Sequence, residues 1–263
     1  MSIAFDRAAG YYDESRGLGP EAEELVADRV EAAVRPGGRL LEIGVGTGRI
    51  ALPLHRRGRE AVGIDLSLPM LERYRAKAAA AGLAPPALLR ADATRLPFPG
   101  ACFDAVLEVH VLHLVPDWQG ALAEARRVLA PGGVLLHGGG GRYERGSASP
   151  RDQVISRFEE LAGAADRTSR VVGAASQEEI RERLVAMGGR VEELEPVLWE
   201  EQETYAEALA WVEGRVFSYH WRLPDEVWSA AAAQVRAELE AAGTDLHTPR
   251  AARHQFRFLA VRF

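Results

Sequence analysis

The sequence predicts an α/β fold in which helices cover both faces of a mostly parallel sheet. Three observations predict it. Strand and helix signals alternate along the first half of the 263-residue chain, the strands are near-continuous apolar runs, and a glycine-rich turn joins a strand at 40–43 to a helix. Because 47% of the residues are hydrophobic and 27% are charged, the chain has enough apolar material for a buried core.

The elements of the first half follow from apolar spacing, caps and chain breaks. A helix over 20–34 has apolar residues at helical spacing, and a Pro-Gly-Gly run at 36–38 ends it. The later elements are helix 49–57, strand 60–65, helix 68–81, strand 87–93, strand 103–108, helix 119–129 and strand 134–137. Ser67 is placed to cap the helix over 68–81, and a second Pro-Gly-Gly run at 131–133 ends the helix over 119–129.

The second half of the chain is less regular. Its predicted elements are a flexible glycine junction at 138–141, helices at 152–162 and 176–187, and strands at 191–198 and 255–261. Ser176 opens the second of these helices with a capping box. Two helical segments interrupted at Pro224 lie in an insertion over about 201–248, which we expect to form a helical cap. The aromatic side chains of this cap are expected either to form its core or to line a pocket.

Charge and cysteine content exclude several classes of protein. The net charge of −6 argues against a nucleic-acid partner, because nucleic-acid-binding domains carry a basic face. The one cysteine, Cys102, cannot form an internal disulfide and suits a reducing compartment. Residues 1–30 lack the pattern of a signal peptide, and there is no run of about 18 apolar residues that would predict a membrane span. We therefore expect a cytoplasmic protein without a membrane span.

The stretch 40–49, LLEIGVGTGR, is the most informative part of the chain. Its glycines stand at 44, 46 and 48, where they permit a tight turn with positive φ and let a ligand approach the backbone N–H groups. The next strand, 60–65, ends in Asp65. A carboxylate at that strand end can accept hydrogen bonds from ribose hydroxyls. The alternative role of Asp65 is to cap the following helix.

Further pieces follow the glycine turn and Asp65 in a fixed order. A strand at 87–93 ends in a second acid, a Leu-Pro-Phe-Pro motif follows at 96–99, and a strand at 103–108 begins with Phe-Asp. This ordered set resembles the class I S-adenosylmethionine-dependent methyltransferases. Within them it is similar to the small-molecule enzymes of the ubiquinone and menaquinone branch. An ordered set of motifs is more specific than one glycine pattern.

The resemblance covers residues 1–141 and continues more loosely to the end of the chain. It implies a Rossmann-like, doubly wound sheet of seven strands, with S-adenosylmethionine as the cofactor and an unidentified small molecule as the methyl acceptor. We expect one methyltransferase domain over 1–263. Its expected parts are N-terminal helices over the cofactor at 1–35, a cofactor-binding core at 36–141, and a C-terminal half at 142–263 that carries the helical cap.

The resemblance also implies which residues hold the cofactor. The glycine turn would support its methionine half, with Glu42 ordering the turn, while Leu66 and Met70 would lie against the adenine and Asp92 would accept from its amine. The full expected set is Tyr12, Arg16, Glu42, Gly44, Gly46, Thr47, Gly48, Asp65, Leu66, Met70, Asp92, Ala93, Glu108 and Val109. Asp92 could instead satisfy local N–H groups, and Tyr12 could belong to an ordinary packed helix.

Catalysis needs few dedicated groups, because methyl transfer is an in-line displacement that mainly requires alignment. Where the acceptor must lose a proton, His110, His113 and Glu108 are the candidate bases. His113 could equally be a helix-start histidine bonded to backbone. The histidines are scattered, there is one cysteine, and no His-x-x-x-His pair occurs, so no metal site is predicted.

Two other functions remain open. A nicotinamide-dependent oxidoreductase would explain the glycine turn and Asp65, but its fingerprint would have glycine where Arg49 stands. It also leaves the acid at the end of the 87–93 strand and the Leu-Pro-Phe motif unexplained. A non-catalytic protein that binds S-adenosylmethionine would keep the cofactor residues and lack an open acceptor pocket.

Overall fold

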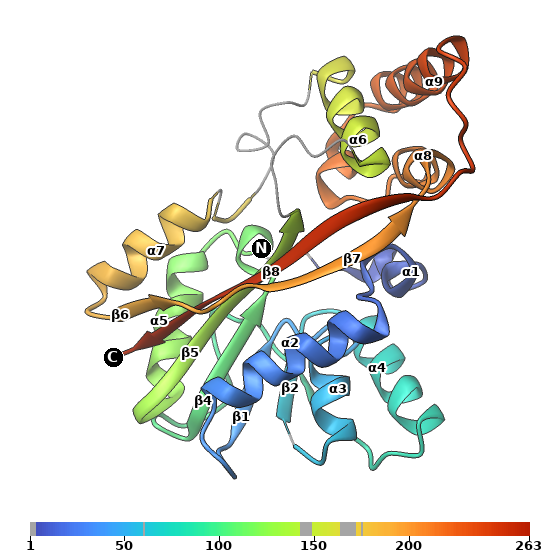
Figure 1. The fold of residues 1–263 in the computed structure, drawn as a ribbon. Coiled ribbons are helices and arrows are strands. Elements are labelled where there is room, and N and C mark those ends of the chain that lie inside the picture. The colour runs from blue at the N-terminus through green and yellow to red at the C-terminus, as the bar shows by residue number, and fades with distance from the viewer. Residues whose placement is uncertain (1–3, 60, 143–148, 164–171, 175) are drawn as a thin grey trace. The chain divides into compact units, whose positions relative to one another are not determined.

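The computed structural model describes residues 4–59, 61–142, 149–163, 172–174 and 176–263 (Figure 1). The chain divides into two compact units. Unit 1 consists of Met1–Gly140, Val172–Val197 and Phe256–Phe263, and unit 2 consists of Gly141–Val171 and Leu198–Gln255.

The described strands form one sheet in the order β3-β2-β1-β4-β5-β8-β6, with β7 paired to β8. They are β1 (Leu40–Ile43), β2 (Ala61–Asp65), β3 (Ala87–Arg90), β4 (Phe103–Val109), β5 (Leu129–Arg142), β6 (Arg190–Glu193), β7 (Val197–Glu203) and β8 (Arg250–Arg262). The pairs from β3 to β5 are parallel, whereas β6 and β8 are antiparallel. The predicted mostly parallel sheet is confirmed, with eight strands among the described residues where seven were expected.

The described helices of unit 1 are η1 (Asp6–Ala8), α1 (Tyr12–Arg16), α2 (Pro20–Ala33), α3 (Ala51–Arg56), α4 (Leu68–Ala80), η2 (Leu112–Leu114), α5 (Trp118–Val128) and α7 (Gln177–Ala186). Two of them, α4 and α7, begin at the caps that the sequence predicts. Ser67 Oγ accepts the Met70 N–H at 3.3 Å, as predicted for the cap of α4. Ser176 Oγ likewise accepts the Glu179 N–H at 3.1 Å at the start of α7.

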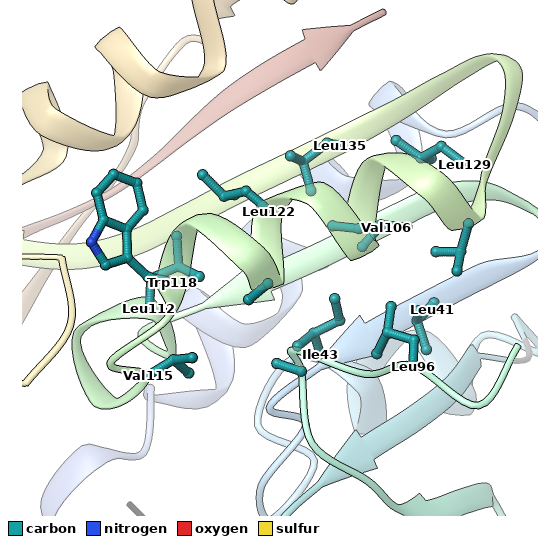
Figure 2. Close-up of a cluster of buried hydrophobic side chains, with 14 of the residues drawn as sticks. Leu41, Ile43, Leu96, Val106, Leu112, Val115, Trp118, Leu122, Leu129 and Leu135 are labelled. Carbon is teal, nitrogen blue, oxygen red and sulfur yellow. The ribbon is translucent and has the colours of Figure 1, made fainter. Parts of the chain in front are cut away.

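The main core of unit 1 lies between the central strands and α5 (Figure 2). Leu41 and Ile43 of β1, Val106 of β4 and Leu135 of β5 pack there with Leu122 of α5, and all five are at most 1% exposed. Every residue of β1 and β4 is buried, so both faces of these strands are covered. At about 1.5–3 kcal/mol for each fully buried large apolar side chain, this core holds the carboxyl ends of β1 and β4 firmly in place.

Several segments differ from the sequence prediction. The strand expected over 134–137 is longer, because β5 begins at Leu129 and includes the Pro-Gly-Gly run at 131–133. Residues 138–141, expected to form a flexible junction, are part of β5. A Cβ atom on Gly138 would lie 2.5 Å from the Phe258 ring, so this glycine lets an aromatic side chain pack directly on the strand. The single strand expected over 191–198 is two strands, β6 and β7, because Pro196 between them has no N–H to donate to a ladder.

Unit 2 contains a helical cluster and the paired part of β7 and β8. Its helices are α6 (Pro150–Leu161), α8 (Tyr205–Glu213), η4 (Ser218–Arg222) and α9 (Asp225–Ala241). Phe158 of α6, Leu209 of α8 and Val235 of α9 are buried in one cluster. Pro224 is the N-cap of α9, as the predicted interruption requires. Since α6 packs on α8 and α9, this cluster includes residues that precede the expected 201–248 insertion.

Candidate functional site

The predicted site residues lie in unit 1, most of them around the carboxyl ends of β1, β2 and β4. Asp92 and Ala93 follow β3, and Tyr12 and Arg16 belong to α1. The strand order reverses direction between β1 and β4, because β2 and β3 follow β1 on one side and β5 follows β4 on the other. In open parallel sheets such a switch point leaves a crevice beyond the strand ends where ligands bind. The fold therefore gathers the expected residues where a ligand site belongs.

The glycine turn after β1 needs its glycines for two reasons. Gly44, Gly46 and Gly48 all have positive φ, between 55° and 78°. A Cβ on Gly44 would also lie 2.7 Å from Val111, and one on Gly48 would lie 2.4 Å from the Tyr74 ring. At these two positions close packing of the protein itself occupies the space. The glycines at 44 and 48 are thus explained by this packing, without the approach of a ligand.

Asp65 joins the glycine turn to the end of β2. Its Oδ2 accepts the Gly46 N–H at 3.0 Å and its Oδ1 accepts the Ser67 N–H at 2.8 Å. Burial raises the pKa of Asp65, although these backbone N–H groups act in the opposite direction. The N-cap of α4 is Ser67, so the alternative role of Asp65 as the cap is wrong. Each carboxylate oxygen can accept more than one hydrogen bond, so the geometry leaves room for the expected ribose contacts.

Glu42 lies on β1 directly before the turn and is 3% exposed. Its Oε2 is buried and has no hydrogen-bond partner among the described residues. Burial raises its pKa to about 8, with a smaller upward contribution from Asp65 and an opposing one from Arg49. A neutral carboxyl group at this position can donate as well as accept a hydrogen bond.

The N-terminal segment is tied to the glycine turn through Asp13, which the predicted site omits. Thr47 Oγ1 donates to Asp13 Oδ1 at 2.6 Å, and Lys77 Nζ of α4 donates to the same oxygen at 3.0 Å. Tyr12 packs edge-on against Phe5, with ring centroids 6.1 Å apart. The side chain of Arg16 lies outside the described residues. Helix α1 is therefore held against the predicted cofactor turn by an acid next to Tyr12.

The residues expected around the adenine come from the ends of β2 and β3. Met70 is 2% exposed, and its Cε would lie 3.3 Å from a Cβ on Gly46. The Ala91 N–H donates to the Asp65 carbonyl at 3.1 Å, which brings Asp92 and Ala93 near the end of β2. Asp92 Oδ1 accepts both the N–H and the hydroxyl of Thr94. Asp92 thus satisfies a local N–H group, which was the alternative to its predicted contact with the adenine amine.

Leu66 follows β2 directly and is partly exposed, and its carbonyl accepts the Arg90 Nε–H at 2.9 Å. Its side chain remains a predicted adenine contact.

The predicted catalytic residues follow β4. Val109 is its last residue and is 7% exposed. His110 has a positive φ of 53° and donates its N–H to the Gly138 carbonyl at 3.3 Å. The backbone carbonyl of His113 in η2 accepts the Gly173 N–H at 3.1 Å. Their catalytic roles remain predictions.

Sequence reasoning missed His137, which contacts Glu108, and Gln177, which contacts His137. His137 Nδ1 of β5 lies 3.1 Å from Glu108 Oε1, and His137 Nε2 lies 2.9 Å from Gln177 Oε1 at the start of α7. Glu108 and His137 are paired in register and are 1% and 4% exposed. A histidine at the end of an otherwise apolar strand was the signal that could have found this pair.

In the described part of the chain, no group of three or more His, Cys, Asp or Glu side chains could hold a metal ion. The same described residues contain no helix that is both long and apolar enough to cross a membrane.

Residues 41–137 match a protein-family model described as a methyltransferase domain. A phosphatidylethanolamine N-methyltransferase of Cereibacter sphaeroides is 37% identical over 128 residues, which cover 48% of this chain and 63% of the relative. A demethylmenaquinone methyltransferase of Thermus thermophilus is 47% identical over 100 residues, 37% of this chain and 45% of the relative. The chain thus spans less than two thirds of the length of either curated relative.

A solved structure shows the same fold across nearly the whole chain. Phosphoethanolamine N-methyltransferase 2 of Haemonchus contortus, in complex with S-adenosyl-L-methionine, has a TM-score of 0.56 at 19% identity. The alignment covers 98% of this chain and 57% of that one. The likeness confirms the predicted fold class.

Proposed function

We propose that this chain, whose residues 41–137 belong to the methyltransferase domain family, transfers a methyl group from S-adenosylmethionine to a small-molecule acceptor. The family match confirms the family that the sequence predicted. The expected cofactor agrees with that family, and a protein of the same fold was solved with S-adenosylmethionine bound.

The observation that carries the proposal is the grouping of the glycine turn, Asp65 and two buried acids at the switch point of the sheet. Glu42 Oε2 and Glu108 Oε2 are buried and have no hydrogen-bond partner among the described residues. S-adenosylmethionine carries an ammonium group, ribose hydroxyls and a positive sulfonium, all of which suit carboxyl oxygens. The residues present therefore fit this cofactor.

Each residue would act by binding and orienting, since the cofactor when bound supplies an activated methyl group. Asp65 would accept the ribose hydroxyls while it holds Gly46 in place. Met70 and Leu66 would cover the adenine with apolar surface, and Asp13 with Thr47 would close the N-terminal segment over the turn. Holding both reactants in line supplies most of what this reaction needs.

The acceptor is proposed only as a small molecule. The two curated relatives are named for different acceptors, so their names do not select one. The net charge of −6 favours a small molecule over a nucleic acid.

Calorimetric titration of the full chain with S-adenosylmethionine, S-adenosylhomocysteine and NAD tests the cofactor. We expect both S-adenosyl compounds to bind and NAD to give no heat. Asp65→Asn should raise the Kd at least tenfold, because a charged hydrogen bond contributes about 1.5–3 kcal/mol. Asp104→Asn is the matched control: it alters another aspartate that accepts a backbone N–H, at the opposite end of a strand.

A screen of small-molecule acceptors with methyl-labelled cofactor then tests transfer. Labelled product supports the proposal. Binding of NAD, without either S-adenosyl compound, would overturn it.

A further inference from the structure

Glu108, His137 and Gln177 form a chain of contacts that links two strands of the sheet to a helix. Glu108 of β4 and His137 of β5 face each other in register, with Nδ1 of the histidine 3.1 Å from Oε1 of the glutamate. The other ring nitrogen lies 2.9 Å from Oε1 of Gln177. All three residues belong to unit 1.

The imidazole of His137 has a partner at each ring nitrogen. Nε2 faces the amide oxygen of Gln177, and Nδ1 faces Glu108 Oε1, both within hydrogen-bond distance. The imidazole is thereby held on both sides, and one oxygen of Glu108 is engaged.

The second carboxyl oxygen of Glu108 has no described hydrogen-bond partner. Oε2 is buried and accepts no hydrogen bond from any described residue. Leaving a buried acceptor unsatisfied is unfavourable, and more so when the group is charged. A pair that served only to join β4 to β5 would not need a carboxylate with a second, unsatisfied buried oxygen. That oxygen is free to accept a hydrogen bond from a bound molecule.

This unsatisfied oxygen lies at the end of β4 that borders the glycine turn. Glu108 is the register partner of Ile43, the residue before Gly44. Val111, three positions after Glu108, packs against Gly44 so closely that a Cβ there would meet it at 2.7 Å. Glu108 thus lies on the strand next to the proposed cofactor turn.

We propose that Glu108 Oε2 accepts a hydrogen bond from an N–H or O–H group of the methyl acceptor, and that His137 and Gln177 are positioning residues which hold Glu108 for this contact. The acceptor is therefore a protic nucleophile, an amine or an alcohol. This inference rests on the proposed methyltransferase function and assigns a substrate class to its site.

Two cofactor analogues test the contact without a known acceptor. Sinefungin carries a primary amine where S-adenosylmethionine carries its methylsulfonium, and S-adenosylhomocysteine has neither group. We expect the full chain to bind sinefungin at least tenfold more tightly than S-adenosylhomocysteine by calorimetry, since the amine supplies a charged hydrogen-bond donor. Glu108→Gln should remove this preference, and His137→Asn should reduce it. Asp104→Asn, at the other end of the same strand, should keep it.

Glu108→Asp provides a second variant in case the amide destabilises the strand. It keeps the charge, withdraws the oxygens by one methylene, and should also lose the preference. Retention of the sinefungin preference in either folded Glu108 variant would overturn the proposal.

Binding of S-adenosylmethionine shows whether Glu108 recognises a hydrogen-bond donor or only a positive charge, because its sulfonium is positive but has no N–H. We compare the ratio of the Kd for S-adenosylhomocysteine to the Kd for S-adenosylmethionine in the unaltered chain and in Glu108→Gln. If this ratio falls as much as the corresponding ratio for sinefungin, Glu108 recognises the cofactor's charge, which would also overturn the inference. Failure of the proposed function has a different signature: the unaltered chain would bind neither S-adenosyl compound.

Discussion

Units 1 and 2 both bury glutamates next to histidines, but they surround them differently. In unit 2, Glu203 Oε2 accepts the Arg151 N–H at 3.3 Å. Its Oε1 is buried and accepts no described hydrogen bond, but it lies 3.2 Å from His254 Nε2 and 3.8 Å from Arg151 Nε. Burial alone would raise the pKa of Glu203, but His254, Arg151 and Ser149 together lower it. In unit 1, Glu42 Oε2 and Glu108 Oε2 are buried and also accept no described hydrogen bond, and neither oxygen forms an ion pair with a described residue.

Asp104 shows that an acid of unit 1 can also be surrounded by charged partners. It lies near the start of β4, where its Oδ2 accepts the Arg39 N–H at 2.7 Å and its Oδ1 accepts from Arg35. Glu42 and Glu108, whose Oε2 atoms have neither a hydrogen bond nor an ion pair among the described residues, lie toward the carboxyl ends of β1 and β4. A buried acid beside cations holds the fold together, whereas a buried acid oxygen that faces no described cation is where we propose that a ligand binds.

Glu203→Gln should give the largest loss of stability among these acids. Removing one partner of a buried charge pair leaves the other uncompensated, so we expect the free energy of unfolding to fall by about 3 kcal/mol. The lowered pKa means that this contribution is present above the ordinary value of 4.5 and is lost as pH falls below it. Chemical denaturation at pH 7 and pH 3 measures both effects. An equal loss at the two pH values would show that the charge does not matter.

Glu42→Gln should raise the free energy of unfolding at pH 8, whereas Glu203→Gln lowers it. Because the pKa of Glu42 is raised to about 8, its folded form holds a proton that the unfolded chain releases above pH 4.5. The free energy of unfolding should therefore decline as pH rises from about 4.5 to about 8, by up to about 1.4 kcal/mol per pH unit, with no further decline above that. The amide variant lacks this titration and should be the more stable protein at pH 8. Parallel stability curves for the two proteins between pH 4.5 and pH 8 would contradict the raised pKa.

Asp104→Asn tests the comparison inside unit 1. It removes the charge beneath Arg35 and weakens the bond from the Arg39 N–H, so we expect a loss of about 1.5 kcal/mol. The loss is smaller than for Glu203 because Arg35 is exposed and screened by solvent. Denaturant titration gives the value. A loss larger than that of Glu203→Gln would reverse the order of the two acids.

Asp13→Ala should have the smallest effect on global stability, less than about 1 kcal/mol, since its partners Lys77 and Arg73 lie partly in solvent. Its effect should appear locally. Without the bond from Thr47, hydrogen exchange over 5–18 should become faster, and added S-adenosylmethionine should slow it less than in the unaltered chain. Glu14→Ala, at the neighbouring exposed position, is the control. Unchanged exchange in Asp13→Ala would show that Asp13 does not hold the segment.

Much of the fold could be predicted where local signals agree with tertiary structure. The caps at Ser67 and Ser176 and the apolar strands β1 and β4 were all readable from neighbouring residues. Gly138 was misassigned because a glycine run predicts flexibility locally. Its extended conformation depends instead on Phe258, far away in the sequence.

In the site, too, residues defined by long-range contacts could not be predicted from local sequence. The glycine turn and Asp65 follow a fixed order along the chain and were found. His137 and Gln177 were not found, because their importance comes from contacts between residues far apart in sequence. His137 is 29 positions from Glu108, and Gln177 is 40 positions from His137. Asp13 was missed as a site residue for a similar reason, since Thr47 is 34 positions away.

The close approach of Phe258 to Gly138 has a consequence for how the sequence can vary. A methyl group at 138 would collide with the ring at 2.5 Å, in a position buried on β5. Any enlargement at 138 therefore requires a smaller side chain at 258. In an alignment of homologues these two positions should exchange volume together, a small residue in one accompanying a large residue in the other. Covariation of this kind would also record that β5 and β8 stay neighbours while the acceptor changes.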